Sequence, residues 1–364
     1  MNKWSQKLIT GVLLFFAAVA TPVWAVNFGV FGDISYTDSN VSGATNAFAL
    51  GGLDLYAQES IDENTRAFVE LVIENNGSEF VIDLERLWIS RSVSDSMNIS
   101  AGRFHTPLGY WNRSYHHGAL LFDTITRPAF LEYEDAGTAI LPLHIVGLMF
   151  DGDMTMGDGN LAYEFGIGNG PSYDTSGGYG SSEININNTS DPNRAKSPVL
   201  RVTYALDAIP LQFGVFGMSN NVAESGTGGA SGVAAGETLV QQTIAGVDLN
   251  YSGERFDAIA EYFQLKNDDK YGSTGSHTGT AYYLQFGYQI TERFKPVYRY
   301  ESLEFNDNDA YFTLLGSRQE KRHVAALRYD LDDSNALKLQ VTNVRPKSGE
   351  SSREYAIQWA FLIP

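Results

Sequence analysis

Charged and aromatic side chains are interleaved through one segment, residues 105–143, in a pattern suited to sorting ions. The basic residues that would attract anionic groups are Arg113, His116, His117 and Arg127. The acidic residues that would oppose them are Asp123, Glu132, Glu134 and Asp135. Rings of charged side chains at a narrow point set which ions pass through a channel. Tyr110 and Trp111 would pack the segment or stack on a solute.

The same segment holds many large apolar residues, which a solvated surface loop would lack. They are Tyr110, Trp111, Leu120, Leu121, Phe122, Phe130, Leu131, Ile140 and Leu141. A segment that folds back onto an inner protein wall can bury such residues. We therefore expect residues 105–143 to form an inward-folded constriction loop.

Four of the six histidines lie in or beside this segment, namely His105, His116, His117 and His144. Histidine changes charge near neutral pH and binds metals through its neutral ring, so a pH-sensitive gate or a metal site is one hypothesis. The alternative, which we favour, is that these rings hydrogen-bond the segment to the wall. The acidic, glycine-rich stretch 151–159 lacks the bidentate glutamate of a calcium loop and is interpreted as a turn. We expect no metal and no other cofactor.

The elements that must hold this segment are predicted by alternation of apolar with polar or small residues. Tyr355, Ile357, Trp359 and Phe361 recur with a period of two, which indicates a strand with one apolar face. Sixteen such strands are predicted, beginning near Asn27, Asn46, Thr65, Phe80, Met97, His144, Asn160, Pro198, Leu211, Leu239, Arg255, Thr280, Phe294, Arg322, Ala336 and Arg353. Short turns alternate with long connections, as in bacterial outer-membrane barrels.

The predicted fold class is all-β, a transmembrane antiparallel β-barrel of about 16 strands. Its charged faces must line the lumen, because an Arg or Lys facing lipid at mid-bilayer costs about 2–4 kcal/mol. The lumen-wall residues predicted in this way are Arg66, Glu70, Arg201, Asp257, Glu261, Arg299 and Glu301. Side chains cannot fill so wide a barrel, so its interior should hold water.

The strand that begins at Phe80 does not fit this alternation. Arg86 shares a face with the apolar Leu84 and Trp88 if the strand is regular. A β-bulge or a contact between subunits would accommodate the arginine.

The first 25 residues have the features of a secretory signal, with Lys3 and Lys7 before a short apolar run and a cleavage point after Ala25. We expect export by the general secretory route to the outer membrane, with one barrel domain over residues 26–364. The chain has 25 basic and 43 acidic residues, a net charge of −18 and no cysteine. This acidity argues against nucleic acid as a partner, and the missing cysteine excludes a disulfide framework.

A resemblance to a known family covers residues 80–170. The run Gly102-Arg103-Phe104-His105-Thr106-Pro107-Leu108-Gly109 resembles the G-[RQ]-F-x-x-P-x-G signature of the phosphate-selective porin family. This resemblance implies an outer-membrane pore, usually a homotrimer, with an inward-folded constriction loop. The family's phosphate-binding members use ladders of arginine and a lysine cluster, whereas residues 105–143 contain no lysine. Phosphate selectivity is therefore not carried over.

These observations predict a porin for passive diffusion of ions and small hydrophilic solutes, in contact with outer-membrane lipid and lipopolysaccharide. The acidic balance predicts a modest preference for cations. A binding or adhesion barrel is an alternative, and an outer-membrane hydrolase is a weaker one because no motif ties a nucleophile to a base. We therefore expect a protein that is not an enzyme. Ion conduction in a planar bilayer would separate the channel from both alternatives.

Overall fold

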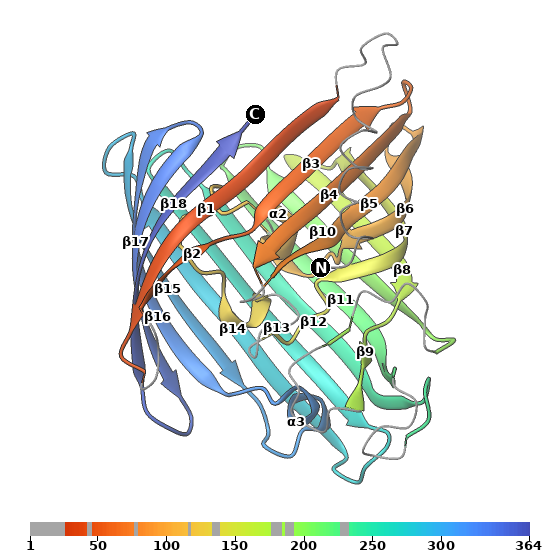
Figure 1. Cartoon of the computed structure of the whole chain (residues 1–364). Coiled ribbons are helices and arrows are strands. Elements are labelled where there is room, and N and C mark those ends of the chain that lie inside the picture. The colour runs from red at the N-terminus through yellow and green to blue at the C-terminus, as the bar shows by residue number, and fades with distance from the viewer. Residues whose placement is uncertain are drawn as a thin grey trace, which may run out of the picture.

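A sheet closes on itself to form a barrel in the computed structural model (Figure 1). The structure describes residues 26–41, 46–75, 79–115, 118–132, 139–175, 184–185, 193–225 and 233–364. Its strands are β1 (Asn27–Ser39), β2 (Ala47–Leu50), β3 (Leu53–Ser60), β4 (Thr65–Asn75), β5 (Phe80–Ser94), β6 (Met97–His105), β7 (His144–Thr155), β8 (Gly159–Asn169), β9 (Ser172–Tyr173), β10 (Lys196–Leu206), β11 (Leu211–Glu224), β12 (Thr238–Ser252), β13 (Phe256–Asp269), β14 (Ser276–Tyr288), β15 (Phe294–Glu304), β16 (Glu320–Asp332), β17 (Asn335–Pro346) and β18 (Ser352–Ile363).

Sixteen strands build the barrel wall, as predicted. β2 and β3 both pair with β1 and act as one interrupted strand, while the two-residue β9 pairs in parallel with the end of β11. The interruption falls at Gly51, whose N–H donates to the carbonyl oxygen of Asp33 at 3.0 Å. A Cβ atom at Gly51 would lie 1.9 Å from the Asp33 carboxylate, so a larger residue there would require the Asp33 side chain to move. Each of the sixteen predicted starts falls within four residues of an observed one.

The barrel is closed by an antiparallel seam between β1 and β18. Their register runs from Val30 opposite Ile363 to Ser39 opposite Glu354. The seam leaves neither strand with an open edge, which lipid would not tolerate. Leu362 continues the last strand beyond its aromatic residues.

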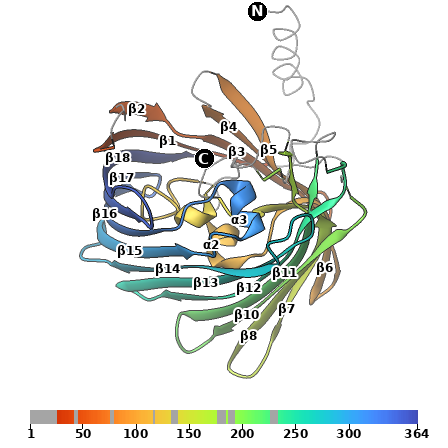
Figure 2. The same cartoon turned by 90° about the horizontal axis from the view of Figure 1, so that it is seen from below.

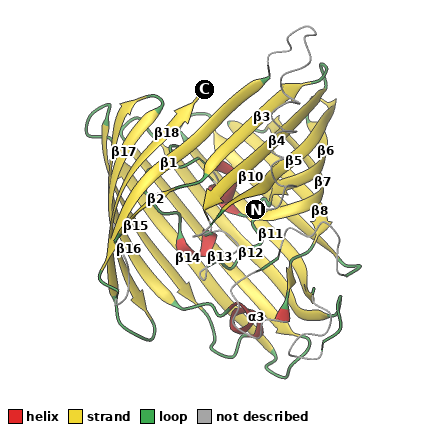
Figure 3. Ribbon diagram, viewed as in Figure 1, coloured by secondary structure: helices red, strands yellow, loops and turns green. Residues whose placement is uncertain are grey.

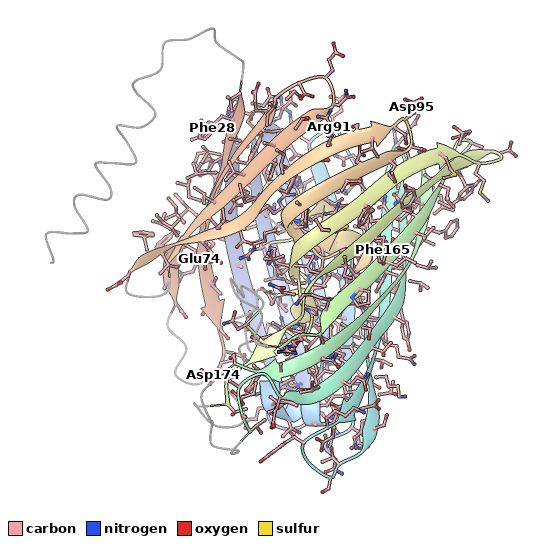
Figure 4. The ribbon with its side chains drawn as sticks, turned by 90° about the vertical axis from the view of Figure 1, so that its right-hand side faces the viewer. Phe28, Glu74, Arg91, Asp95, Phe165 and Asp174 are labelled. Atoms are coloured by element: carbon pink, nitrogen blue, oxygen red, sulfur yellow. The ribbon has the colours of Figure 1, made fainter. Side chains whose placement is uncertain are left out.

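The two faces of the strands differ as the alternation predicted. On β14, Leu284 and Phe286 are 40% and 43% exposed, whereas Tyr283 and Gln285, which alternate with them, are almost fully buried. On β17 the buried positions are Ala336, Lys338, Gln340 and Thr342. Apolar side chains such as Phe165 stand on the outside of the wall (Figure 4). Polar and charged side chains therefore face the interior.

A β-bulge on β5 resolves the position of Arg86. In the β4–β5 register, Glu70 lies opposite Arg86 and the next residue, Leu71, lies opposite Leu84, so Glu85 is the extra residue. The shift turns Arg86 to the inner face, where its Nε lies 2.6 Å from Oε2 of Glu70. The arginine also lies over the Phe68 ring, 4.4 Å from the ring centroid. Of the two predicted explanations, the bulge is confirmed.

Two short helices lie within the ring of strands when the barrel is viewed from below (Figure 2). They are α2 (Gly109–Ser114), in the connection between β6 and β7, and α3 (Ala310–Leu315), between β15 and β16. Asp309 caps α3 by accepting hydrogen bonds from the N–H groups of Tyr311 and Phe312. Figure 3 shows how little helix the fold contains. In the part of the chain that the structure describes, no helix is long and apolar enough to span a membrane.

Candidate functional site

The β6–β7 segment, residues 105–143, begins with a turn that only glycine can make. Gly109 has φ +77°, in the left-handed region, and a Cβ atom there would lie 2.2 Å from Oε2 of Glu261 on β13. The turn starts α2 and directs the N–H of Trp111 at the wall. The N–H of Trp111 donates to Oε1 of Glu261 at 2.5 Å, and the Tyr283 hydroxyl donates to the same oxygen at 2.9 Å. Glu261 therefore fixes where α2 docks.

Trp111 is the centre of the aromatic packing around α2. It is 1% exposed, and its ring lies 5.2 Å from Tyr115, 5.5 Å from Phe122 and 6.0 Å from Tyr283, measured between centroids. The Arg299 guanidinium lies 5.7 Å from its centroid. Burying a ring of this size contributes more to holding the segment than any single hydrogen bond does.

Wall cations hold the next stretch of the segment through its backbone. Lys338 Nζ, on β17, donates to the carbonyl oxygens of Ala119 and Thr124. Arg328 on β16 donates to the Leu120 carbonyl at 2.7 Å. These contacts satisfy backbone acceptors that would otherwise lack partners away from water. The anchoring strands, β16 and β17, lie far around the barrel from β6 and β7, so the described part of the segment contacts strands well separated in the sheet.

Arg299 on β15 makes the densest set of these contacts. Its guanidinium donates to Thr124 Oγ1 at 2.7 Å, to the Thr126 carbonyl at 2.9 Å and to the Arg127 carbonyl at 2.9 Å. Its Nε pairs with Glu301 at 2.7 Å, and the other oxygen of Glu301 accepts from the N–H of Ala129 at 2.7 Å. Arg299 is fully buried. Its charge therefore orders the segment and does not face the open lumen.

Strand β3 also contacts the segment, at Gly118. The N–H of Gly118 donates to Oδ2 of Asp54 on β3 at 2.8 Å. Asn112 joins the two ends of the segment. Its Nδ2 donates to the carbonyl oxygens of Thr106, near the beginning, and Leu143, at the end, at 2.8 and 3.0 Å. The α3 helix adds one more contact, from the Tyr311 hydroxyl to the Ile140 carbonyl at 2.6 Å.

The predicted charged residues of the segment that the structure describes are paired with other groups. Arg113 forms an ion pair with Glu164 on β8, and Asp123 pairs with Lys295 on β15 at 2.8 Å. Arg127 is buried and donates to the carbonyl oxygen of Leu131 at 3.2 Å. Each is paired with a partner from the wall or the segment itself.

Other predicted residues are placed differently. Burial raises the pKa of Glu132, against the attraction of Arg127 and Arg322. Tyr110 is partly buried, with its ring 5.7 Å from that of Tyr115. The predictions for His116, His117, Glu134 and Asp135 fall outside the described residues.

The seven predicted wall residues all lie on the inner face of their strands. Arg66 is exposed to the lumen, while Glu70 pairs with Arg86. Arg201 pairs with Asp248 at 2.8 Å, and Asp257 pairs with Lys295 at 2.6 Å. Glu261, Arg299 and Glu301 hold the segment, as described above.

Glu164 was not among the predicted residues. It lies within ion-pair distance of both Arg113 and Arg201, so it joins the segment to the wall. The alternation along β8 was a signal that could have found it, because Phe165 and Ile167 beside it are exposed on the outer face. Arg86 was missed for another reason, because the bulge inverts the phase of its strand.

The histidines at the root of the segment are buried beside carboxylates. His105 and His144 lie opposite each other on β6 and β7, with ring centroids 5.2 Å apart. His144 Nε2 lies 2.8 Å from Oε2 of Glu85, and His105 Nε2 lies 3.9 Å from Oε2 of Glu70. Among the described residues, no group of three or more His, Cys, Asp or Glu side chains is arranged to hold a metal.

Two cavities remain open beside the segment, and each carries both signs of charge. The first, of about 330 Å³, is lined by Trp88, Phe104 and charged residues that include Arg66, Arg86, Arg113, Asp151, Asp153 and Glu164. The second, of about 360 Å³, is lined by Tyr115 and charged residues that include Asp123, Glu254, Arg255, Asp257, Lys295, Arg328 and Asp330. Each cavity therefore presents charged groups of both signs.

The fold is that of outer-membrane porins of known structure. An anion-selective porin from Comamonas acidovorans superposes with a TM-score of 0.61 at 12% identity, covering 93% of this chain and 99% of that chain. The outer-membrane channel DcaP of Acinetobacter baumannii gives 0.61 at 10% identity, covering 93% and 97%. A trimer form of OmpT, an outer-membrane protein of Vibrio cholerae, gives 0.58 at 9% identity, covering 93% and 99%. No protein-family model matches the sequence, and no curated protein sequence is significantly similar to it.

Proposed function

We propose that this protein is an outer-membrane porin, a water-filled passage for passive diffusion of ions and small hydrophilic solutes. The observation that carries the proposal is the anchoring of the β6–β7 segment. In a closed sixteen-strand barrel, Arg299, Arg328 and Lys338 hold the segment across the interior and leave charged cavities beside it. A barrel of this width is otherwise too wide for side chains to close.

The segment is the proposed constriction, and its selectivity is proposed to be weak and cationic. Four acidic side chains line the second cavity, Asp123, Glu254, Asp257 and Asp330, against three basic ones, Arg255, Lys295 and Arg328. The net charge of −18 adds a diffuse attraction for cations. The strong pairing of Asp123 and Asp257 with Lys295 reduces the field at the cavity.

The test is conduction through purified protein in a planar lipid bilayer. Stepwise current increases on addition of folded protein, absent with heat-denatured protein, are the expected result. A reversal potential measured across a KCl gradient then reports the preference between K⁺ and Cl⁻. A folded protein that inserts without conducting would refute the channel, and a clear anion preference would refute the proposed selectivity.

A homotrimer is also proposed, with the outward face of β2 and β5 as its interface. Phe48, Phe80 and Ile82 are 81%, 62% and 71% exposed. Large apolar side chains on such a face fit lipid or a second subunit. Chemical cross-linking in mild detergent would give a three-subunit band, and a monomer alone would contradict the proposal.

A further inference from the structure

Three basic side chains gather on the outward face of neighbouring strands, at the end of the barrel that bears α3. Lys321 lies on β16, Arg345 on β17 and Arg353 on β18, and all three are exposed. Each is in phase with exposed apolar residues of its own strand, for example Leu339 on β17 and Ile357 on β18. We call these three residues the basic cluster. Figure 1 shows the three strands side by side.

The register forces these like charges together. Lys321 and Arg345 are directly opposite in the β16–β17 ladder, and Arg353 lies opposite Asn343, two residues before Arg345. Like charges directly opposite each other destabilise a sheet. An anion held between them would offset that repulsion.

Acidic partners compensate the cluster only in part. Lys321 Nζ lies 2.8 Å from Glu304, whereas Arg353 Nε donates to the neutral side chain of Asn343 at 2.8 Å. Within the described part of the chain, Arg345 has no carboxylate within ion-pair distance. On the β1 side of the cluster, the nearest outward acidic residue along the seam is Asp38, which lies opposite Tyr355. A surplus of positive charge here stands out in a chain of net charge −18.

Two hollows flank Arg345 and complete the geometry. One, of about 420 Å³, is lined by Lys321, Arg345, Pro346 and Lys347 together with Glu304 and Glu320, whose carboxylates pair with Lys321 and Arg322. The other, of about 400 Å³, is lined by Asn343, Arg345, Ser352, Arg353 and Tyr355. Both offer hydrogen-bond donors together with positive charge. Arginine beside hydroxyl and amide groups is a common environment for a phosphate group.

From the basic cluster towards the middle of the wall, the outward side chains change from charged to aromatic to aliphatic. Towards the middle of the wall come His323 and Tyr298, whose hydroxyl lies 2.7 Å from Nδ1 of His323. Beyond them lie the exposed aliphatic side chains Leu327, Leu339 and Ile357. Cations, then amphipathic aromatic residues, then aliphatic residues match headgroup, interface and acyl chains.

We propose that the basic cluster binds the phosphate groups of lipopolysaccharide in the outer leaflet, with the acyl chains along the aliphatic residues beside it. The proposal rests on the outer-membrane location but not on conduction. Each Arg or Lys near a lipid phosphate contributes about 1 kcal/mol, so two arginines together correspond to about a tenfold change in affinity or more.

The experiment titrates the full-length protein in zwitterionic detergent with diphosphorylated lipid A and with lipid A from which the phosphates are removed, and counts bound lipid by native mass spectrometry. The variant is Arg345→Gln/Arg353→Gln. The matched control is Lys196→Gln/Lys266→Gln, which removes the same charge from outward positions on β10 and β13. Arg345→Lys/Arg353→Lys keeps the charge, and a heat-modifiable gel shift verifies that each variant is folded.

We expect wild type, the control and the Lys variant to bind diphosphorylated lipid A alike, and the Gln variant to bind at least tenfold more weakly. Removing the phosphates should weaken wild-type binding to the level of the Gln variant. Equal binding by the Gln variant, or by lipid without phosphates, would overturn the proposal. Displacement of the lipid by millimolar inorganic phosphate would also overturn it, because that result assigns the site to a free anion. Conductance of the same variants in a bilayer tests the porin function separately.

Discussion

The N–H of Trp111 and the carboxylate of Glu261 are joined by a hydrogen bond of 2.5 Å, which docks α2 on β13. Glu261 is buried, and its Oε1 also accepts from Tyr283. One carboxylate oxygen thus serves a backbone group of the segment and a side chain of the wall. Glu261 therefore determines how strongly the β6–β7 segment is held against β13.

Glu261→Ala should destabilise the barrel by about 1–3 kcal/mol, because the buried Trp111 N–H and Tyr283 hydroxyl would lose their acceptor. Glu261→Gln keeps an amide oxygen at the same reach and should cost less. The measurement is the guanidinium midpoint of unfolding, followed by tryptophan fluorescence. Equal midpoints for the two variants would contradict the docking role.

Gly109→Ala should destabilise the fold more than Gly275→Ala. Both glycines have positive φ, +77° and +83°, so each substitution costs about 1–2 kcal/mol in backbone strain. Only at Gly109 does the added Cβ also approach the Glu261 carboxylate, at 2.2 Å, while at Gly275 nothing lies within 4 Å. Unfolding midpoints measured side by side report the difference, and similar losses would show that the turn can relax.

Lys338→Met should loosen the β6–β7 segment without changing the barrel wall. The carbonyl oxygens of Ala119 and Thr124 would lose a buried donor, at about 1–3 kcal/mol for each unsatisfied group. The expected result in single-channel recordings is a larger mean conductance with more open-channel noise. Lys347→Met is the matched control, because Lys347 is exposed and pairs with Asp307 in an outer connection. Identical traces for both variants would count against a constriction held by Lys338.

Asp123→Asn should shift the ion preference of the channel towards anions. The substitution removes one negative charge from the second cavity and leaves Lys295 and Arg328 less compensated. Reversal potentials under a KCl gradient measure the shift. Asp62→Asn, in an exposed turn, is the control and should leave the potential unchanged. A shift of equal size in both variants would assign selectivity to overall charge alone.

The sequence predicted the wall well because lipid and water impose a period of two on every strand. That pattern correctly predicted that Lys338 faces the interior and that a strand begins at Phe294. The interruption at Gly51 was not predicted, because it depends on the close approach of Asp33 on a neighbouring strand.

The segment was harder to predict than the wall. Its apolar residues indicated burial, but the partners of Arg299 are backbone carbonyl oxygens, which no side-chain pattern encodes. The expectation of a charged ring took no account of ion-pair partners for Arg113 and Asp123. Their partners, Glu164 and Lys295, lie on strands distant in sequence, so these pairs can be identified only from the three-dimensional arrangement of the strands.

The seam between β1 and β18 also bears on how such a molecule is made. The two strands that meet there are separated by more of the sequence than any other paired strands of the sheet, so closing the seam carries the largest loop-closure cost. Until then two unsatisfied edges would invite pairing with other chains. Closing the seam therefore removes the two edges at which an unfinished barrel would pair with another chain.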